Sequence, residues 1–274
     1  QAFAVHRLSS QHREFSDLDM DEGARGSLIH EILELFWSEV KTSDRLRELH
    51  DSGGLTSQIH QCIEKGLQKS EIDLYGQKAF FELEKERLAS LLQEWMKYEL
   101  EKRGTFKIFD LEQKKYLQLN GLALELRVDR IDELDNGGKV IIDYKTGTNQ
   151  NLKKWFGDRI EEPQLPLYSQ IVPADALAFA EIRKGKSRYR GLSIEPGMIP
   201  GVDLYSKYKD CPEMDHWEEV RDYWKIRLDR TAKDFLDGNL VIDPVNEKET
   251  CKVCDQKTFC RKTELLSRFE GEDE

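Results

Sequence analysis

The sequence predicts an α/β fold in which helices flank a central mixed β-sheet, with additional helices at the N-terminal end. Apolar residues recur at helical spacing before about residue 104 and again near the C-terminal end, as in helices with one buried face. Between these regions the apolar period changes to two, as in strands whose alternate side chains face a core. Helices packed on such a sheet give a layered architecture.

The first predicted helix begins near Gly26, and His30 falls in its first turn. Its apolar residues follow one another at a spacing of three or four, which indicates a single buried stripe. The stripe consists of Ile29, Leu33, Phe36 and Val40, with Ile32 and Leu35 beside it.

More helix is expected before the sheet. Residues 41–76 are polar and are broken by Gly53-Gly54, which predicts shorter helices. Residues 77–103 carry aromatic and leucine side chains at helical spacing, which predicts a long amphipathic helix. We expect one domain over residues 1–274, of which residues 1–104 form the helical part.

Residues 105–192 are expected to hold the sheet. The alternation of apolar and polar side chains in residues 122–132 predicts a strand with one apolar face. Asp-Asn-Gly-Gly at residues 135–138 is a strong hairpin-turn signal, and an apolar run, Val140-Ile141-Ile142, follows it. Residues 163–171 predict a helix and residues 176–182 a further strand.

Composition limits the classes of protein. The formal net charge is −11, with 53 Asp and Glu residues against 42 Lys and Arg residues, which argues against a passive nucleic-acid coat. It does not exclude a nuclease that binds DNA through a local basic strip. Five cysteines, with no signal peptide and no long apolar run, favour a reducing cytoplasm without a membrane span. The chain begins with Gln1 and not Met, so we expect a processed form or a fragment.

The predicted hairpin brings chemically useful side chains together. Asp129 lies on the strand face opposite the leucine stripe, and Asp143 and Lys145, two residues apart, share one face while Tyr144 points to the other. If the strand edge is open there, the Tyr144 carbonyl is free to join the aspartates as an ion ligand. Such hard oxygen ligands suit Mg²⁺ or Mn²⁺.

This set of groups matches what phosphodiester hydrolysis needs. A metal screens the anionic phosphodiester and lowers the pKa of a bound water, and a lysine orients that water or stabilises the transition state. The alternative is an ordinary surface ion pair, because Asp-x-Lys alone is a common tripeptide.

Several motifs now support one family. Val-Asp-Arg-Ile-Asp at 128–132, Val-Ile-Ile-Asp-Tyr-Lys-Thr-Gly at 140–147, Gln-Leu-Pro-Leu-Tyr at 164–168 and Gly26-x-x-x-His30 together resemble the PD-(D/E)XK nucleases of the RecB/AddB exonuclease type. The resemblance covers nearly the whole chain, with the motifs in the right order. It implies a restriction-endonuclease-like core.

The resemblance also implies roles for individual residues. It implies His30, Asp129 and Asp143 as metal ligands, the Tyr144 carbonyl as a further donor and Lys145 as the catalytic lysine. Gln164 and Tyr168 match the family's Q-x-x-x-Y helix, which lies beside the active site and helps to position substrate. Taken alone, His30 and the Gln164–Tyr168 pair could equally be structural.

Residues 193–274 are expected to contain a helix at 215–236 and a cysteine tail. Cys251, Cys254 and Cys260 form C-x2-C-x5-C, a set of thiolates suited to a soft metal or an iron–sulfur cluster, with structural zinc as the alternative. In the family that the chain resembles, a fourth cysteine upstream completes a four-iron, four-sulfur cluster. Residues 1–8 resemble the segment after that cysteine, so the fourth ligand is expected before Gln1. Cys62 and Cys211 are alternative candidates for the fourth ligand, but they lie in unrelated contexts and are interpreted as lone thiols.

Candidate DNA contacts form two groups. The densest basic run could track a phosphate backbone or could be a solvated hairpin turn. Arg127 and Arg130 lie nearer the predicted chemistry and could hold the scissile strand. The basic run consists of Arg183, Lys184, Lys186, Arg188 and Arg190.

The sequence therefore favours a metal-dependent DNA nuclease of repair or recombination, most simply an exonuclease. The first alternative is a non-catalytic DNA-end-binding or scaffold module of a helicase–nuclease repair complex. The second is a nuclease lobe whose helicase lies upstream or in a partner, since the sequence has no nucleotide-binding loop of the P-loop type.

Overall fold

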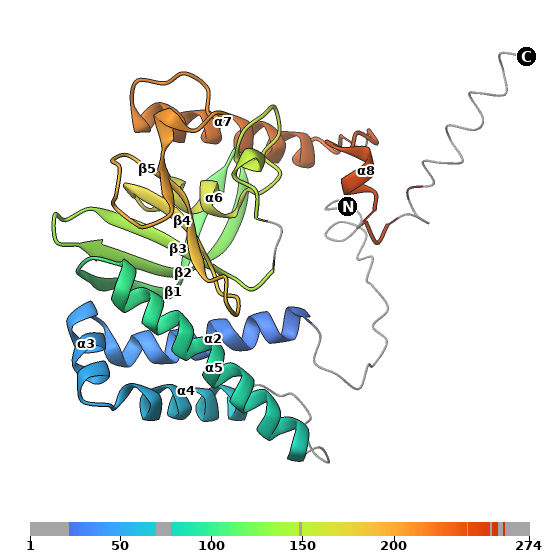
Figure 1. The fold of residues 1–274 in the computed structure, drawn as a ribbon. Coiled ribbons are helices and arrows are strands. Elements are labelled where there is room, and N and C mark those ends of the chain that lie inside the picture. Colours follow the sequence, from blue (N-terminus) through green and yellow to red (C-terminus); the bar gives the residue numbers. More distant parts are fainter. Residues whose placement is uncertain are drawn as a thin grey trace, which may run out of the picture.

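A six-stranded mixed sheet lies between two groups of helices (Figure 1). The computed structural model describes residues 22–69, 78–147, 150–239, 241–252, 254–256 and 260. The strands follow one another across the sheet in chain order. They are β1 (Phe106–Leu119), β2 (Leu122–Leu134), β3 (Lys139–Lys145), β4 (Ala176–Glu181), β5 (Arg188–Ser193) and β6 (Val202–Leu204).

The sheet is mixed because of how its strands are connected. Strands β1, β2 and β3 are antiparallel neighbours, as are β4 and β5, whereas the β3–β4 and β5–β6 pairs are parallel. A parallel pair needs a crossover, and between β3 and β4 it consists of the short helix η1 (Leu152–Trp155) and α6 (Gln164–Ile171).

Helices cover both faces of the sheet. One face carries the N-terminal helices and the other carries α6 and α7, as Figure 1 shows. The N-terminal group is α2 (Glu22–Val40), α3 (Ser43–Asp51), α4 (Leu55–Lys69) and α5 (Lys78–Lys102). The remaining helices are η2 (Tyr205–Lys207), α7 (Trp217–Leu236) and α8 (Glu247–Thr250).

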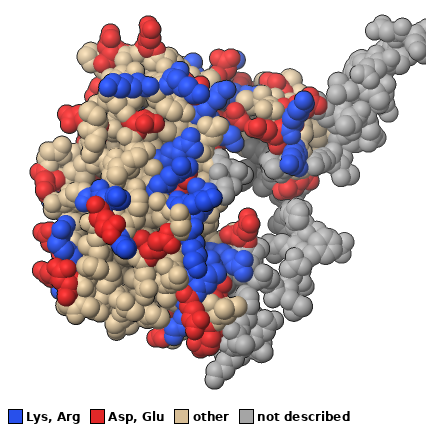
Figure 2. Space-filling model, viewed as in Figure 1, with Lys and Arg blue, Asp and Glu red and all other residues tan. Residues whose placement is uncertain are grey.

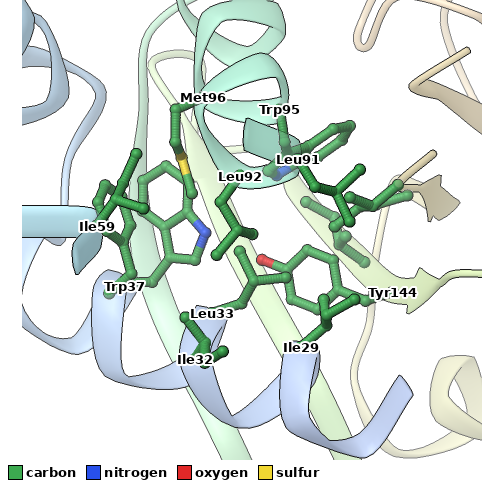
Figure 3. Close-up of a cluster of buried hydrophobic side chains, with 14 of the residues drawn as sticks. Ile29, Ile32, Leu33, Trp37, Ile59, Leu91, Leu92, Trp95, Met96 and Tyr144 are labelled. Carbon is green, nitrogen blue, oxygen red and sulfur yellow. The ribbon is translucent and has the colours of Figure 1, made fainter. Parts of the chain in front are cut away.

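The alternation of β3 distributes its side chains between two cores. Val140, Ile142 and Tyr144 belong to the core under the N-terminal helices, whereas Ile141 belongs to the core under α6 and α7. Figure 3 shows the Tyr144 ring among side chains of α2 and α5, including Ile29. The prediction that Tyr144 points away from the face of Asp143 and Lys145 is therefore confirmed.

The predicted hairpin is also confirmed. The Leu134 amide donates to the Gly138 carbonyl at 2.9 Å and closes the turn between β2 and β3. Gly137 has a φ of 81°, a conformation that glycine adopts without a steric penalty.

Two details differ from the sequence prediction. Helix α2 begins at Glu22, so His30 lies in the helix interior and not in its first turn; the segment before Gly26 lacks an apolar stripe but is helical. The sequence pattern does not predict strands β5 and β6, because two of the six residues of β5 are Arg and a third is Gly191, and β6 has three residues. A short strand with few apolar residues carries little periodic signal.

No helix in the described part of the chain combines the length and apolar character needed to cross a membrane.

Candidate active site

The site forms where β2 and β3 separate. Their paired residues end at Arg130 and Ile142, and Asp129 and Asp143 follow immediately beyond. The Tyr144 amide, no longer part of the β2 ladder, donates instead to Asp129 Oδ2 at 2.8 Å. The Tyr144 carbonyl faces His30, whose Nε2 lies 2.9 Å away. The edge of β3 that faces β2 is therefore open at Tyr144, which is the condition for its carbonyl to serve as an ion ligand.

Helix α2 brings His30 into this gap from the other side of the sheet. The second ring nitrogen, Nδ1, lies 3.3 Å from Asp129 Oδ2, so the imidazole spans the Asp129 carboxylate and the Tyr144 carbonyl. Burial disfavours the charged imidazole, but the hydrogen bond and the charge of Asp129 outweigh it and raise the pKa of His30.

Asp143 is the most deeply buried acid of the site, with no exposed surface. Its Oδ2 lies 2.6 Å from Lys145 Nζ, yet neither carboxylate oxygen makes a well-directed hydrogen bond. Burial, followed by the charge of Asp129, raises the pKa of Asp143 to about 7. A buried carboxylate with unsatisfied oxygens needs a partner, and a divalent cation provides one.

Helix α6 holds Lys145 in place. Lys145 Nζ donates to Gln164 Oε1 at 2.7 Å, and Gln164 Nε2 donates to the Tyr168 hydroxyl at 2.9 Å. The Tyr168 hydroxyl donates in turn to the Arg127 carbonyl at 2.6 Å. One chain of hydrogen bonds thus joins the end of β3, through α6, to the segment of β2 that carries Asp129. Asp143 lies against Lys145 at one end of this chain, and Asp129 lies against His30 at the other.

These residues suit a hard divalent cation. Carboxylates, a backbone carbonyl and an imidazole are ligands that Mg²⁺ or Mn²⁺ accepts, and the unsatisfied oxygens of Asp143 fit that use. In the part of the chain that the structure describes, the one group of three or more such side chains with ligand atoms within 4.8 Å of one another is His30, Glu112 and Asp129.

Sequence reasoning did not single out Glu112. It lies on β1. Because Leu111 pairs with Arg130 and Gln113 pairs with Val128, Glu112 between them lies opposite Asp129. Burial, followed by the charge of Asp129, raises the pKa of Glu112 to about 7. The signal that could have found it is the β1–β2 register, which no local motif in the sequence marks.

The prediction that Arg130 contacts DNA is wrong. Its side chain is fully buried, and Nε and Nη2 make a bidentate pair with Asp132 at 2.6 and 2.7 Å. Its Nη1 donates to Glu99 at 3.1 Å, and the guanidinium lies over the Trp37 ring. Arg130 points away from Asp129, because neighbouring strand residues face opposite sides of the sheet. It contacts the Tyr144 hydroxyl at 3.3 Å, behind the site.

Arg127 remains accessible, with 58% of its side chain exposed, and pairs with Glu34 and Glu112. The basic run occupies the β4–β5 hairpin and its neighbours. Within it, Arg183 and Arg188 both pair with the buried Glu181, and Arg190 donates to the Gln150 carbonyl. The ends of this run are therefore partly engaged within the protein.

Lys184 and Lys186 are exposed at the tip of that hairpin, with no ion pair to another described residue. Arg183 and Lys184 line a pocket together with Thr146 and Gly147, which directly follow Lys145. Figure 2 shows Lys and Arg side chains gathered in a band over the part of the molecule where Figure 1 places this hairpin. Basic charge is thus concentrated beside the end of β3 despite the acidic composition.

The tail cysteines are free thiols of intermediate exposure, and Cys62 is buried. Among the residues that the structure describes, no three cysteine sulfur atoms lie within 4.8 Å of one another. The tail thiols Cys251, Cys254 and Cys260 therefore do not form a metal-binding group in this arrangement. The arrangement of these sulfur atoms therefore supports neither the zinc nor the iron–sulfur interpretation.

Comparison with known proteins adds a family. The chain is 23% identical, over an alignment of 331 positions, to a subunit of an ATP-dependent helicase/deoxyribonuclease of Clostridium botulinum (strain Loch Maree / Type A3). The alignment covers 94% of this chain but only 28% of that relative. A solved chain titled "Crystal structure of SSO0001" aligns over 84% of both chains with 17% identity and a TM-score of 0.33, a likeness too weak to carry an argument.

A family model also matches nearly the whole chain. The family model of the PD-(D/E)XK nuclease superfamily matches residues 2–261, which includes every strand of the sheet and every residue of the site. The mixed sheet with helices on both faces agrees with the restriction-endonuclease-like fold of that superfamily. The chain belongs to the PD-(D/E)XK nuclease superfamily.

Proposed function

We propose that this chain is a metal-dependent nuclease that hydrolyses phosphodiester bonds of DNA, from or near a strand end, in repair or recombination. One observation supports the proposal most strongly. Where β2 and β3 separate, His30, Asp129, Asp143 and the Tyr144 carbonyl converge beside a lysine that α6 holds in place.

In this proposal His30, Asp129, Asp143 and the Tyr144 carbonyl hold Mg²⁺ or Mn²⁺. The ion supplies Lewis acidity and lowers the pKa of water when bound. The protein residues contribute the geometry: Asp129 accepts from the Tyr144 amide, which fixes the direction of the neighbouring carbonyl. Asp143 is buried and pairs with Lys145 through Oδ2, while its Oδ1 has no hydrogen-bond partner among the described residues and is available to a cation.

Lys145 has a separate role in the proposal. Its ammonium group stabilises negative charge that develops on the phosphate, as a preorganised cation does in a partly buried site. The Gln164 side chain accepts a hydrogen bond from Lys145, and Gln164 in turn donates a hydrogen bond to the Tyr168 hydroxyl. These contacts restrict the lysine to one position, so less reorganisation is needed during the reaction.

The test is substitution of each key side chain. Asp129→Ala, Asp143→Ala and Lys145→Ala are each expected to abolish Mg²⁺-dependent degradation of DNA while DNA binding persists. Lys139→Ala is the matched control, because Lys139 begins the same strand but lies over the Phe109 ring, away from the site. Undiminished activity in any of the three variants contradicts the assignment. An inactive wild-type protein that binds DNA favours the scaffold alternative.

End-labelled single- and double-stranded DNA determine the mode of cleavage. Products that shorten progressively from a labelled end support the exonuclease proposal. Internal cuts in circular single-stranded DNA contradict it and indicate an endonuclease.

We also propose that the basic hairpin and Arg127 track the DNA backbone. Replacing Lys184 and Lys186 together by Ala is expected to weaken DNA binding and to lower the salt dependence of affinity by about one unit for each phosphate that the protein no longer neutralises. Lys225→Ala on α7 is the control, since Lys225 pairs with Asp229 on the helix surface. Fluorescence anisotropy at several salt concentrations measures both quantities. An unchanged salt slope in the double variant rules out this DNA path.

Two finer proposals concern context. The helicase named in the relative motivates a helicase partner or an adjacent helicase region for this nuclease. The C-x2-C-x5-C tail motivates a four-iron, four-sulfur cluster held by Cys251, Cys254, Cys260 and a fourth ligand. Iron analysis and visible absorbance of a chain extended upstream test the cluster. A colourless, iron-free product rules it out.

A further inference from the structure

Glu112 is a carboxylate of the candidate site that neither the sequence motifs nor the geometry of the β2–β3 separation explains. Its side chain is only 7% exposed, although the next two residues of β1, Gln113 and Lys114, are exposed. The register places it opposite Asp129, and opposite residues of an antiparallel pair share one face. One of its carboxylate oxygens, one of Asp129's and a nitrogen of His30 lie within 4.8 Å of one another.

The charges around Glu112 are not balanced by the protein alone. Arg127 pairs with Glu112 through Oε2, but the same arginine also pairs with Glu34. A pocket of about 500 Å³ opens onto these residues. Four carboxylates line it, those of Glu31, Glu34, Glu112 and Asp129, against the two cations Arg127 and Lys69, of which Lys69 pairs with Glu31. Carboxylates gathered this closely repel one another and the DNA phosphate, unless a cation lies between them.

A second observation points independently to a ligand. Asp143 is completely buried and pairs with Lys145 through Oδ2, but its Oδ1 has no hydrogen-bond partner in the part of the chain that the structure describes. It interacts electrostatically with both His30 and Asp129. An unsatisfied carboxylate in that position indicates a cation beside His30 and Asp129. Glu112 approaches the same two residues from β1.

We propose that Glu112 is a direct carboxylate ligand of the divalent cation, together with His30 and Asp129. The inference rests on the proposed nuclease function, which it deepens by adding a ligand from a strand that carries none of the recognised motifs. With Glu112 the centre offers three carboxylates, an imidazole and a carbonyl, a predominantly oxygen set suited to Mg²⁺ or Mn²⁺. Arg127 pairs with Oε2 and assists the ligand from outside, so its removal is expected to weaken Mn²⁺ binding less than removal of the Glu112 charge does.

The experiment measures Mn²⁺ affinity directly, by electron paramagnetic resonance or calorimetry on the full chain without DNA. Glu112→Gln keeps the size of the side chain and removes its charge. We expect its Mn²⁺ dissociation constant to rise by about 10-fold or more, within the range that loss of a metal-site interaction produces. Glu34→Gln is the matched control, because Glu34 lines the same pocket and pairs with the same arginine but lies outside the three-residue group. Its affinity is expected to stay within about twofold of the wild type.

The Arg127→Gln variant distinguishes two roles of Glu112, direct binding of the cation and pairing with Arg127. If Glu112 serves only to hold Arg127, the two variants will bind Mn²⁺ alike, and the inference is wrong. Wild-type affinity in Glu112→Gln, or an equal reduction in Glu34→Gln, also overturns it. Circular dichroism and thermal unfolding in EDTA check folding. If Glu112→Gln does not fold, Glu112→Asp replaces it, with weakened Mn²⁺ binding expected and unchanged binding as the overturning result.

Failure of this inference is distinguishable from failure of the proposed function. If the wild-type protein degrades DNA but the Glu112→Gln variant binds Mn²⁺ normally, the inference about Glu112 is wrong and the proposed nuclease function stands. If the protein binds Mn²⁺ through Glu112 but degrades no DNA, the inference about Glu112 stands and the proposed nuclease function is wrong.

Discussion

At the scale of single residues, Asp129 and Arg130 show how neighbours in sequence acquire different environments. Both are polar and both precede the hairpin turn. Asp129 faces the gap between β2 and β3, whereas Arg130 faces the core beneath α2 and α5. There the guanidinium, Asp132, Glu99 and Arg103 form a buried network of ion pairs. This buried cluster supports the Tyr144 side chain from behind.

Arg130→Met tests that structural role. Removing one partner of a buried ion pair leaves an uncompensated charge and costs about 3–5 kcal/mol, so we expect a decrease of that size in the free energy of unfolding in urea. Arg127→Met, at an exposed position, is expected to cost less than about 1 kcal/mol. If Arg130→Met is as stable as the wild type and instead binds DNA more weakly, Arg130 is a DNA contact, as its place in the sequence suggests.

At the scale of elements, close approach between β4 and β5 depends on one glycine. A Cβ at Gly191 would lie 1.9 Å from the Leu177 carbonyl oxygen and 2.8 Å from the Ala178 Cα. Both obstacles are backbone atoms, which cannot rotate away. The pairing that this glycine permits positions the basic hairpin beside the end of β3.

Gly191→Ala is therefore expected to destabilise the protein by about 3 kcal/mol or more, at or above the upper end of typical overpacking costs. Gly104→Ala, where a Cβ would meet nothing within 4 Å, serves as the control and is expected to be nearly neutral. Urea unfolding of both variants measures the difference. Equal stability would show that the β4–β5 pairing can shift to admit a methyl group.

At the scale of the whole molecule, the carboxylates of the site link stability to pH and to metal. The pKa values of Asp143 and Glu112 are both raised to about 7, chiefly by burial. Carboxyl groups whose pKa is raised by folding bind more protons in the folded than in the unfolded state between about pH 4 and pH 7. Their contribution to the stability of the metal-free protein is therefore greatest at low pH and is lost as pH rises through about 7.

Thermal unfolding in EDTA and in Mn²⁺ checks this linkage. At pH 8, Mn²⁺ is expected to raise Tm and EDTA to reverse the increase, because a ligand of the native state stabilises it. Asp143→Asn is expected to lose the increase in Tm, whereas Lys139→Ala is expected to keep it. An equal response of wild type and Asp143→Asn to Mn²⁺ contradicts a metal site at Asp143.

The sequence by itself determined the mixed sheet, the hairpin and the shared face of Asp143 and Lys145. These follow from local rules, since strand alternation and turn chemistry involve residues close in the chain. Only the tertiary structure decided that Arg130 is buried, that the ends of the basic run pair within the protein, and that Glu112 meets His30 and Asp129. Periodicity assigns a side chain to a face, but the elements that cover that face come from distant parts of the chain. Packing alone therefore decides whether a charge reaches solvent, a cation or another charge.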